Sequence, residues 1–160
     1  MPLALIILLP LTGALLPALM PGRSARLLAS VAAIPVLLSL LLLLSQLPHV
    51  MQGGEAIVQQ LNWLPALGLN LALRLDGLGL LFALLITGIG ALILLYARYY
   101  FEGNTASARF FTLTLLFMSA MLGIVLSENL LFMLIFWELT SLVSFLLIGY
   151  NTDRQAARLG

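Results

Sequence analysis

The chain has 160 residues, of which 62% are hydrophobic and only 8% are charged. A soluble domain carries about 25% charged residues, so this composition indicates an integral membrane protein with no separate soluble domain. The net charge of +1 and the absence of lysine argue against a nucleic-acid partner, and the absence of cysteine excludes a disulfide framework or a thiolate metal site.

Five apolar segments predict an all-α integral membrane fold with five transmembrane helices, because a helical span needs about 20 mostly apolar residues. The segments are residues 2–20, 26–47, 77–100, 110–126 and 130–150. The first lacks the basic residues of a signal peptide, since the first positive charge is Arg23, and we interpret it as a retained span. Only residues 127–129 separate the last two segments, which predicts an antiparallel helical pair.

The segment between the second and third spans, residues 48–76, is too polar to cross the bilayer. Its second half alternates leucines with smaller or polar residues, at Leu69, Leu71, Leu73 and Leu75. Because alternation is strand periodicity, we expect a surface β-hairpin in which residues 57–63 pair with this strand across a turn at 65–68. The alternative is an irregular interfacial segment anchored by Trp63.

Arginine placement predicts the orientation. Five spans leave one arginine, Arg74, on the side of the hairpin. The other six lie on the opposite side, at Arg23, Arg26, Arg98, Arg109, Arg154 and Arg158. Cytoplasmic loops are enriched in basic residues, so we expect the N-terminus and the hairpin to be extracytoplasmic.

The strongest functional signal is Glu138, the single charge in the otherwise uncharged run 130–149. A carboxylate near the middle of a span costs several kcal/mol, so its default interpretation is a proton-relay or ion-pathway group. The alternative is an ion pair that holds helices together, although no basic residue lies deep in any span. Thr140, Ser141 and Ser144 are possible supporting polar residues, or else interhelical packing and hydrogen-bonding sites.

Other residues carry weaker signals. We expect Asp76 to cap the third span, and His49 to be solvated in the exposed loop. Gly88 and Gly90 favour close helix packing over a phosphate-binding loop. Glu128 is expected to be a turn residue, although an acid at a pore mouth would attract cations. No metal site, nucleotide site or other cofactor site is expected.

The fifth span contains the sequence FWELTSLVSFLLIGY. The third span lies within the sequence LRLDGLGLLFALLITGIGALILLYARYYF. Both resemble the proton-translocating subunits shared by respiratory complex I and Mrp-type multisubunit cation/proton antiporters, with FWELTS most similar to the large A-type subunit of the Mrp antiporters. The resemblance covers residues 65–160 well and the first two spans only in hydropathy. It implies that Glu138 matches the family's fifth-helix glutamate, which pairs with a lysine on a later helix.

This chain has no lysine and stops at Gly160, so we expect an N-terminal part of a longer subunit. We divide it as follows: residues 1–47, two transmembrane helices; 48–76, hairpin or loop; 77–126, the antiporter-like N-terminal region; and 127–160, the start of the proton-translocating core.

The resemblance implies a multi-pass subunit of a monovalent cation (Na⁺ or K⁺)/proton antiporter in the bacterial cell (inner) membrane. Its partners would be the other subunits of the complex, protons, monovalent cations and membrane lipid. It would be a secondary transporter component, not an enzyme. Two alternatives remain: an antiporter-like subunit of a complex I-type NADH-quinone oxidoreductase, and a structural or assembly protein in which Glu138 forms an interhelical ion pair.

Overall fold

The computed structural model describes residues 2–52, 56–64, 69–101 and 107–149. In chain order the elements are α1 (Pro2–Gly13), α2 (Leu15–Ala18), α3 (Ala25–Met51), β1 (Ile57–Leu64), β2 (Leu69–Leu75), α4 (Gly77–Tyr100), α5 (Ser107–Leu126) and α6 (Leu130–Ile148). Within these ranges four helices, α3 to α6, are long and apolar enough to cross a membrane. The prediction of a helical membrane protein with a small hairpin is confirmed.

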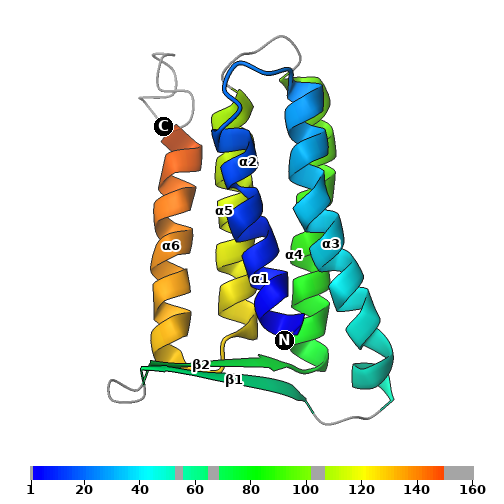
Figure 1. Cartoon of the computed structure of the whole chain (residues 1–160), viewed down its shortest axis with the longest axis vertical. Coiled ribbons are helices and arrows are strands. Elements are labelled where there is room, and N and C mark those ends of the chain that lie inside the picture. Colours follow the sequence, from blue (N-terminus) through cyan, green and yellow to red (C-terminus); the bar gives the residue numbers. More distant parts are fainter. Residues whose placement is uncertain (1, 53–55, 65–68, 102–106, 150–160) are drawn as a thin grey trace.

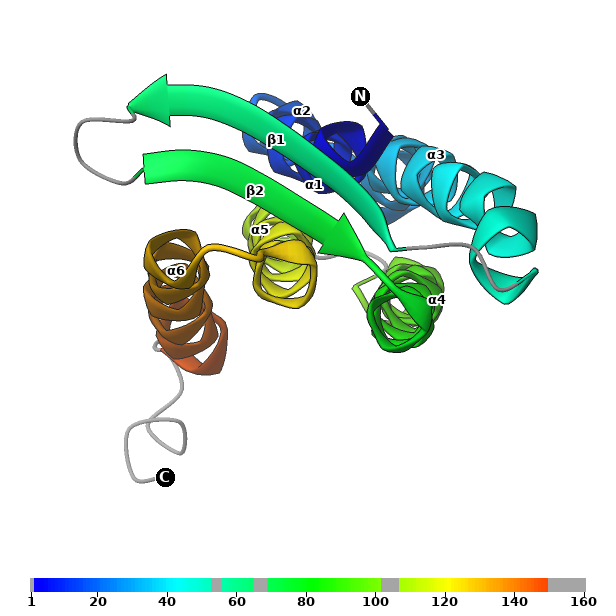
Figure 2. The ribbon, with the colours of Figure 1, turned by 90° about the horizontal axis from the view of Figure 1, so that it is seen from below.

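The helices form an upright bundle, and the hairpin lies across one end of it (Figure 1). Seen from that end, β1 and β2 run across the ends of the helices, with α3 and α6 at opposite sides of the bundle (Figure 2). Helix α3 packs against α4, α5 packs against α6, and α1 packs against both α3 and α5. Helix α5 also contacts α3 and α4 directly, so α1 and α5 together connect the two pairs of helices.

The N-terminal segment differs from the single span expected over residues 2–20. It forms two helices, α1 and α2, interrupted at Ala14. Pro17 contributes to the break, because it has no N–H to bond the carbonyl of Gly13. The apolar stretch Pro2–Ala18 is also shorter than the four candidate spans, at about 25 Å for 1.5 Å per residue.

The predicted hairpin is present as an antiparallel pair. Ile57 pairs with Leu75 and Gln59 pairs with Leu73, with an irregularity between Asn62 and Leu64. Leu73 and Leu75 are fully buried against the bundle, which explains the alternation that predicted this strand. The expected turn at 65–68 lies outside the described residues.

Helix α3 continues to Met51, beyond the boundary expected at residue 47. His49 therefore lies in the last helical turn and not in a loop, which corrects the prediction. Pro35 also stays inside α3, where it is buried. A Cβ at Gly13 would overlap the Pro35 ring, so α1 and α3 approach each other closely there.

The hairpin is attached to the turn between α5 and α6. The amide of Glu128 donates a hydrogen bond of 2.9 Å to the carbonyl of Ala72, and Ser127 forms an isolated antiparallel bridge with Leu73. Arg74 lies 3.6 Å from a carboxylate oxygen of Glu128. A short stretch after α5 thus adds to the free edge of β2.

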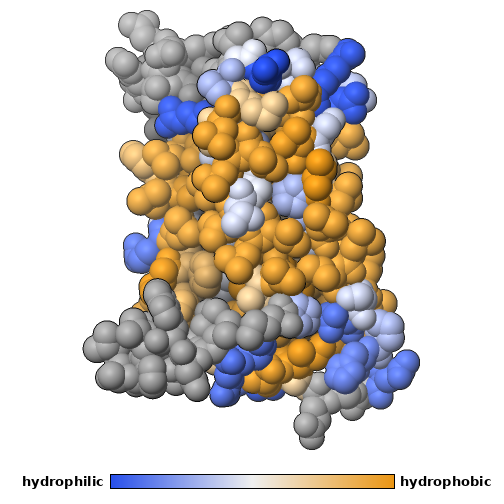
Figure 3. All heavy atoms as spheres, in the orientation of Figure 1, coloured by the Kyte–Doolittle hydropathy of each residue, from blue (hydrophilic) through white to orange (hydrophobic). Residues whose placement is uncertain are grey.

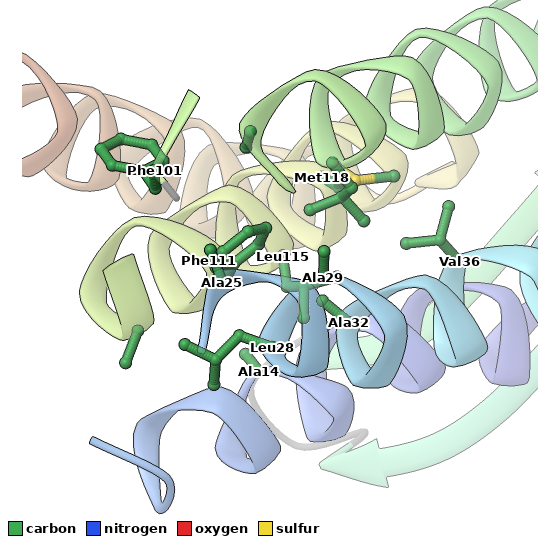
Figure 4. Close-up of a cluster of buried hydrophobic side chains, with 13 residues drawn as sticks. Ala14, Ala25, Leu28, Ala29, Ala32, Val36, Phe101, Phe111, Leu115 and Met118 are labelled. Carbon is green, nitrogen blue, oxygen red and sulfur yellow. The ribbon is translucent and has the colours of Figure 1, made fainter. Parts of the chain in front are cut away.

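Small residues let the helices pack closely. In one buried cluster, alanines of α3 lie against Phe111 and Leu115 of α5 (Figure 4). A Cβ at Gly90 would overlap Met118, so the close packing expected at this glycine is confirmed. No such neighbour lies near Gly88 among the described residues, and the same expectation fails there.

Candidate functional site

Glu138 lies near the middle of α6. Asn129 caps this helix, its side-chain oxygen accepting a hydrogen bond of 2.8 Å from the amide of Leu131. Glu138 follows the first residue, Leu130, by eight positions and precedes the last, Ile148, by ten. At 1.5 Å per residue, these offsets place it about 12 Å and about 15 Å from the two helix ends. Glu138 is therefore close to the middle of α6, the position at which a charge on a transmembrane helix is most costly.

The side chain of Glu138 is exposed on the surface of the bundle. It lines a shallow depression whose other walls are apolar, formed by Ile135, Leu139, Leu142 and Phe145. Within the described ranges Glu138 forms no ion pair, and the interhelical pair considered as its structural role is not made there. Among the described residues, the surface around this carboxylate therefore offers it no cation.

The other predicted polar residues of α6 differ in their bonding. The hydroxyl of Thr140 donates to the carbonyl of Phe136 at 2.8 Å, and that of Ser141 donates to the carbonyl of Trp137 at 3.3 Å. Both bonds are internal to α6, so these two hydroxyls do not connect helices. Ser144 is half-buried. By helical spacing Ser141 shares the Glu138 face, whereas Thr140 and Ser144 lie on another stripe.

Helix α6 is the least buried of the four long helices. Among its 19 residues only Phe132 and Val143 are buried. Gly123 of α5 forms the close contact on the packed side, where a Cβ would overlap the Phe136 ring. The rest of the helix presents apolar side chains outward, so it needs lipid or further protein around it.

Charged residues outside α6 gather at the ends of the bundle. The visible face has an apolar band around its middle and hydrophilic residues towards both ends (Figure 3). At the hairpin end, Arg74 lies 3.6 Å from Asp76 and 3.6 Å from Glu128. Asp76 also caps α4 by accepting a 2.8 Å hydrogen bond from the amide of Gly79, as predicted.

The described residues contain no group of three His, Cys, Asp or Glu side chains that would hold a metal ion. Two of these acids, Asp76 and Glu128, both lie near Arg74, which forms an ion pair with each. The cluster at the hairpin end is thus a local ion-pair network that connects β2 with the turn before α6.

Two buried serines were missed by sequence reasoning. Ser39 of α3 and Ser119 of α5 both donate to backbone carbonyls of α1, at Ile6 and Ile7 respectively. The available signal was Pro10, which leaves the carbonyl four residues before it without a helical donor. These serines hold the first helix in place and do not reach Glu138.

Known proteins resemble this chain over nearly all of its length. It is 44% identical over 158 residues to a probable K⁺/H⁺ antiporter A/B subunit of Rhizobium meliloti, an alignment that covers 99% of this chain and 16% of that protein. It is 39% identical over 130 residues to the Na⁺/H⁺ antiporter A1 subunit of Staphylococcus haemolyticus, covering 81% of this chain and 16% of that protein. The chain thus spans about a sixth of the length of these relatives.

The fold also matches solved structures. A chain of the Mrp complex from Dietzia sp. aligns with a TM-score of 0.67 and 29% identity, covering 92% of this chain and 15% of that chain. A chain of the membrane-bound sulfane sulfur reductase, an archaeal respiratory complex, aligns with a TM-score of 0.72, 24% identity, and coverage of 92% and 23% respectively, which shows a shared fold. Residues 63–111 match the family described as the N-terminus of chain 5 of NADH-ubiquinone oxidoreductase (complex I). The chain is therefore similar to A-type subunits of cation/proton antiporters over most of its length, and over residues 63–111 to the N-terminus of a complex I chain.

Proposed function

We propose that the chain is part of a membrane subunit of a multisubunit monovalent cation/proton antiporter, and that Glu138 belongs to its proton pathway. The observation that supports this most strongly is the 44% identity, over 99% of the chain, to a probable K⁺/H⁺ antiporter subunit. A lone carboxylate at mid-depth of α6 is the feature that such a function would use.

Glu138 lies near the middle of α6 among apolar side chains, and an intramembrane acid in such a setting is by default a proton- or ion-pathway group. A carboxylate in an apolar surrounding is stabilised as an ion only by a nearby cation or by water, and otherwise holds its proton. The described residues bring no cation to the depression around Glu138. The proposed pathway therefore requires a basic side chain from another segment or subunit to approach this face of α6.

The arrangement also supports a location and an orientation. We place the subunit in a bacterial cell membrane as a multi-pass protein that exchanges Na⁺ or K⁺ for protons together with other subunits. The hairpin end would face outward, because six of the seven arginines belong to the opposite side of the predicted topology. Glu138 would then lie about halfway across, reachable from either side only by a water-filled path.

The test is Glu138→Gln in the full-length subunit, co-expressed with its partner subunits and assayed in everted membrane vesicles. Glutamine keeps the size of the side chain and removes the titratable proton. The rate of proton-coupled exchange should therefore fall at least about tenfold, which corresponds to about 1.4 kcal/mol of activation free energy. The matched control is Glu128→Gln, at the hairpin end, which should retain exchange. Unchanged exchange in Glu138→Gln, with the complex assembled, would rule out the pathway role.

One observation favours a second candidate function. The family matched by residues 63–111 is described by a complex I chain, so a proton-translocating subunit of a complex I-type NADH-quinone oxidoreductase is the alternative. An antiporter subunit requires Na⁺ or K⁺ for ΔpH-driven exchange, whereas the alternative requires quinone reduction.

Loss of assembly in Glu138→Gln without loss of exchange by the assembled fraction would instead favour a structural role.

A further inference from the structure

A groove lies between α3 and α4 at the end of the bundle opposite the hairpin. It has a volume of about 210 Å³ and almost entirely apolar walls. Its lining residues are Ala29, Ser30, Ala33, Leu37, Ala91, Leu94, Leu95 and Arg98. The alanines of both helices leave the space, since their side chains do not fill the gap that larger residues would close. The guanidinium of Arg98 lies at one end of this apolar groove.

Arg98 is incompletely bonded. Its Nε is buried, and no acceptor for it is found in the part of the chain that the structure describes. The guanidinium carbon lies 5.6 Å from the centre of the Tyr99 ring, a cation–π contact. A buried donor without an acceptor is destabilising, so an anionic oxygen in the groove would stabilise this side chain.

The surroundings of Arg98 favour an anion over a zwitterion. Arg23 and Arg26 precede and begin α3, and Arg109 is in the first turn of α5, all near the same end. The three acids in the described ranges lie elsewhere: Asp76 and Glu128 at the hairpin end, and Glu138 at mid-depth. Among the residues that the structure describes, positive charge therefore dominates at the mouth of the groove.

The position along the helices is that of a membrane interface. The last turns of α4 carry exposed Tyr96, Tyr99 and Tyr100, and tyrosines are enriched at the level of lipid headgroups. Leu37 and Leu95, further into the bundle along the groove, are half-exposed to the surroundings. The groove is thus polar at headgroup level and apolar towards the membrane interior.

We propose that this groove binds an acidic phospholipid, with the headgroup phosphate on Arg98 and one acyl chain between α3 and α4 over Ala33 and Ala91. The phosphate supplies an acceptor for the buried Nε of Arg98. The acyl chain covers the apolar walls. A free phosphate lacks the acyl chain, and a zwitterionic lipid gains less from the surrounding arginines. This site is independent of Glu138 and of the transported cation.

The experiment uses the full-length subunit in its assembled complex, purified in a mild detergent and analysed by native mass spectrometry after addition of phosphatidylglycerol, phosphatidylcholine or inorganic phosphate. The wild type should retain phosphatidylglycerol in preference to the other two. Arg98→Gln should lower the bound fraction about fivefold, as expected from about 1 kcal/mol per basic residue near an acidic lipid. Ala33→Leu, which fills the groove and keeps Arg98, should also lower it.

The matched control is Arg74→Gln, which removes a half-exposed arginine at the opposite end of the bundle and should leave retention within about twofold of wild type. Equal retention of phosphatidylglycerol and phosphatidylcholine would overturn the proposal, as would equal losses in Arg98→Gln and Arg74→Gln. If inorganic phosphate competed as well as phosphatidylglycerol, the site would bind a free anion and the lipid proposal would be wrong. If a partner subunit were found crosslinked in the groove, the occupant would be that subunit and the lipid proposal would also be wrong. If Arg98→Gln fails to assemble, unchanged lipid retention in Ala33→Leu refutes the proposal by itself.

Discussion

The hydroxyl of Ser39 donates a 3.1 Å hydrogen bond to the carbonyl of Ile6, an acceptor that Pro10 leaves without its normal helical donor. A side chain of α3 thus replaces a backbone bond that α1 cannot make for itself. Ser119 of α5 adds a 2.9 Å bond to the next carbonyl, that of Ile7. In an apolar medium these bonds hold a short, interrupted helix in a defined position.

Ser39→Ala should lower the free energy of unfolding by about 1 kcal/mol, because polar interhelical bonds in membranes contribute about 0.6–1.7 kcal/mol each. The measurement is denaturant unfolding of the full-length subunit in mixed micelles. Ser45→Ala is the matched control on the same helix, since the exposed Ser45 hydroxyl donates only within its own helix, to the carbonyl of Leu42. Equal effects of the two substitutions would contradict the interhelical role of Ser39.

A double-mutant cycle isolates the role of Pro10. Pro10→Ala restores an N–H that can bond the Ile6 carbonyl, so Ser39→Ala should cost less in that background than in wild type. If the cost of Ser39→Ala is the same in both backgrounds, the hydroxyl does not compensate for the proline.

Gly123→Ala should destabilise the packing of α5 on α6, because the added Cβ would overlap the aromatic ring of Phe136. Overpacking of this kind costs about 1–3 kcal/mol. Gly88→Ala provides the control, since its Cβ would point into open space and alanine is a better helix former by about 1 kcal/mol. Thermal unfolding of the two variants should therefore shift in opposite directions.

Asp76→Ala should weaken the start of α4 by about 1 kcal/mol, the usual cost of losing an N-cap. Asp76→Asn keeps an oxygen for the Gly79 amide and removes the charge that faces Arg74. Because Arg74 and Asp76 are about half exposed, their ion pair adds little, and the asparagine variant should unfold near the wild-type temperature. A loss as large in Asp76→Asn as in Asp76→Ala would assign the stability to the charge.

Single cysteines at opposite ends of the bundle should label from opposite sides of the membrane. The 160 residues contain no cysteine, so Arg23→Cys and Gln52→Cys each introduce one site here, with any cysteines elsewhere in the full-length subunit replaced. In the orientation proposed above, a membrane-impermeant maleimide added to intact cells should label position 52 and not position 23. The reverse pattern would invert the topology.

Much of the bundle was predictable because single-segment signals determined it. Residues 77–100 form the predicted helix with the predicted ends, since Asp76 provides a cap and the apolar run has the length of a span. The hairpin followed from leucine alternation, and its buried members, Leu73 and Leu75, face the bundle. Each of these features depends on neighbours in sequence.

Features that depend on the rotation of one helix against another were not predictable. The partner of Ser39 is determined by how α1 packs on α3, and no local pattern specifies that. The same holds for Gly88 and Gly90, two similar glycines of which one meets Met118 and the other meets open space. For Glu138 the depth and chemical identity could be predicted, whereas the groups that act on it depend on surrounding segments.

The pairing of Ala72 and Leu73 with the turn after α5 has a consequence for biosynthesis. In a chain made from the N-terminus, β2 is complete before α5 and α6 have been inserted. Its edge groups stay unpaired until residues 127 and 128 arrive on the same side of the membrane. The edge of β2 is therefore completed by residues made much later in the chain, so this end of the bundle takes its final form only after α5 has been made.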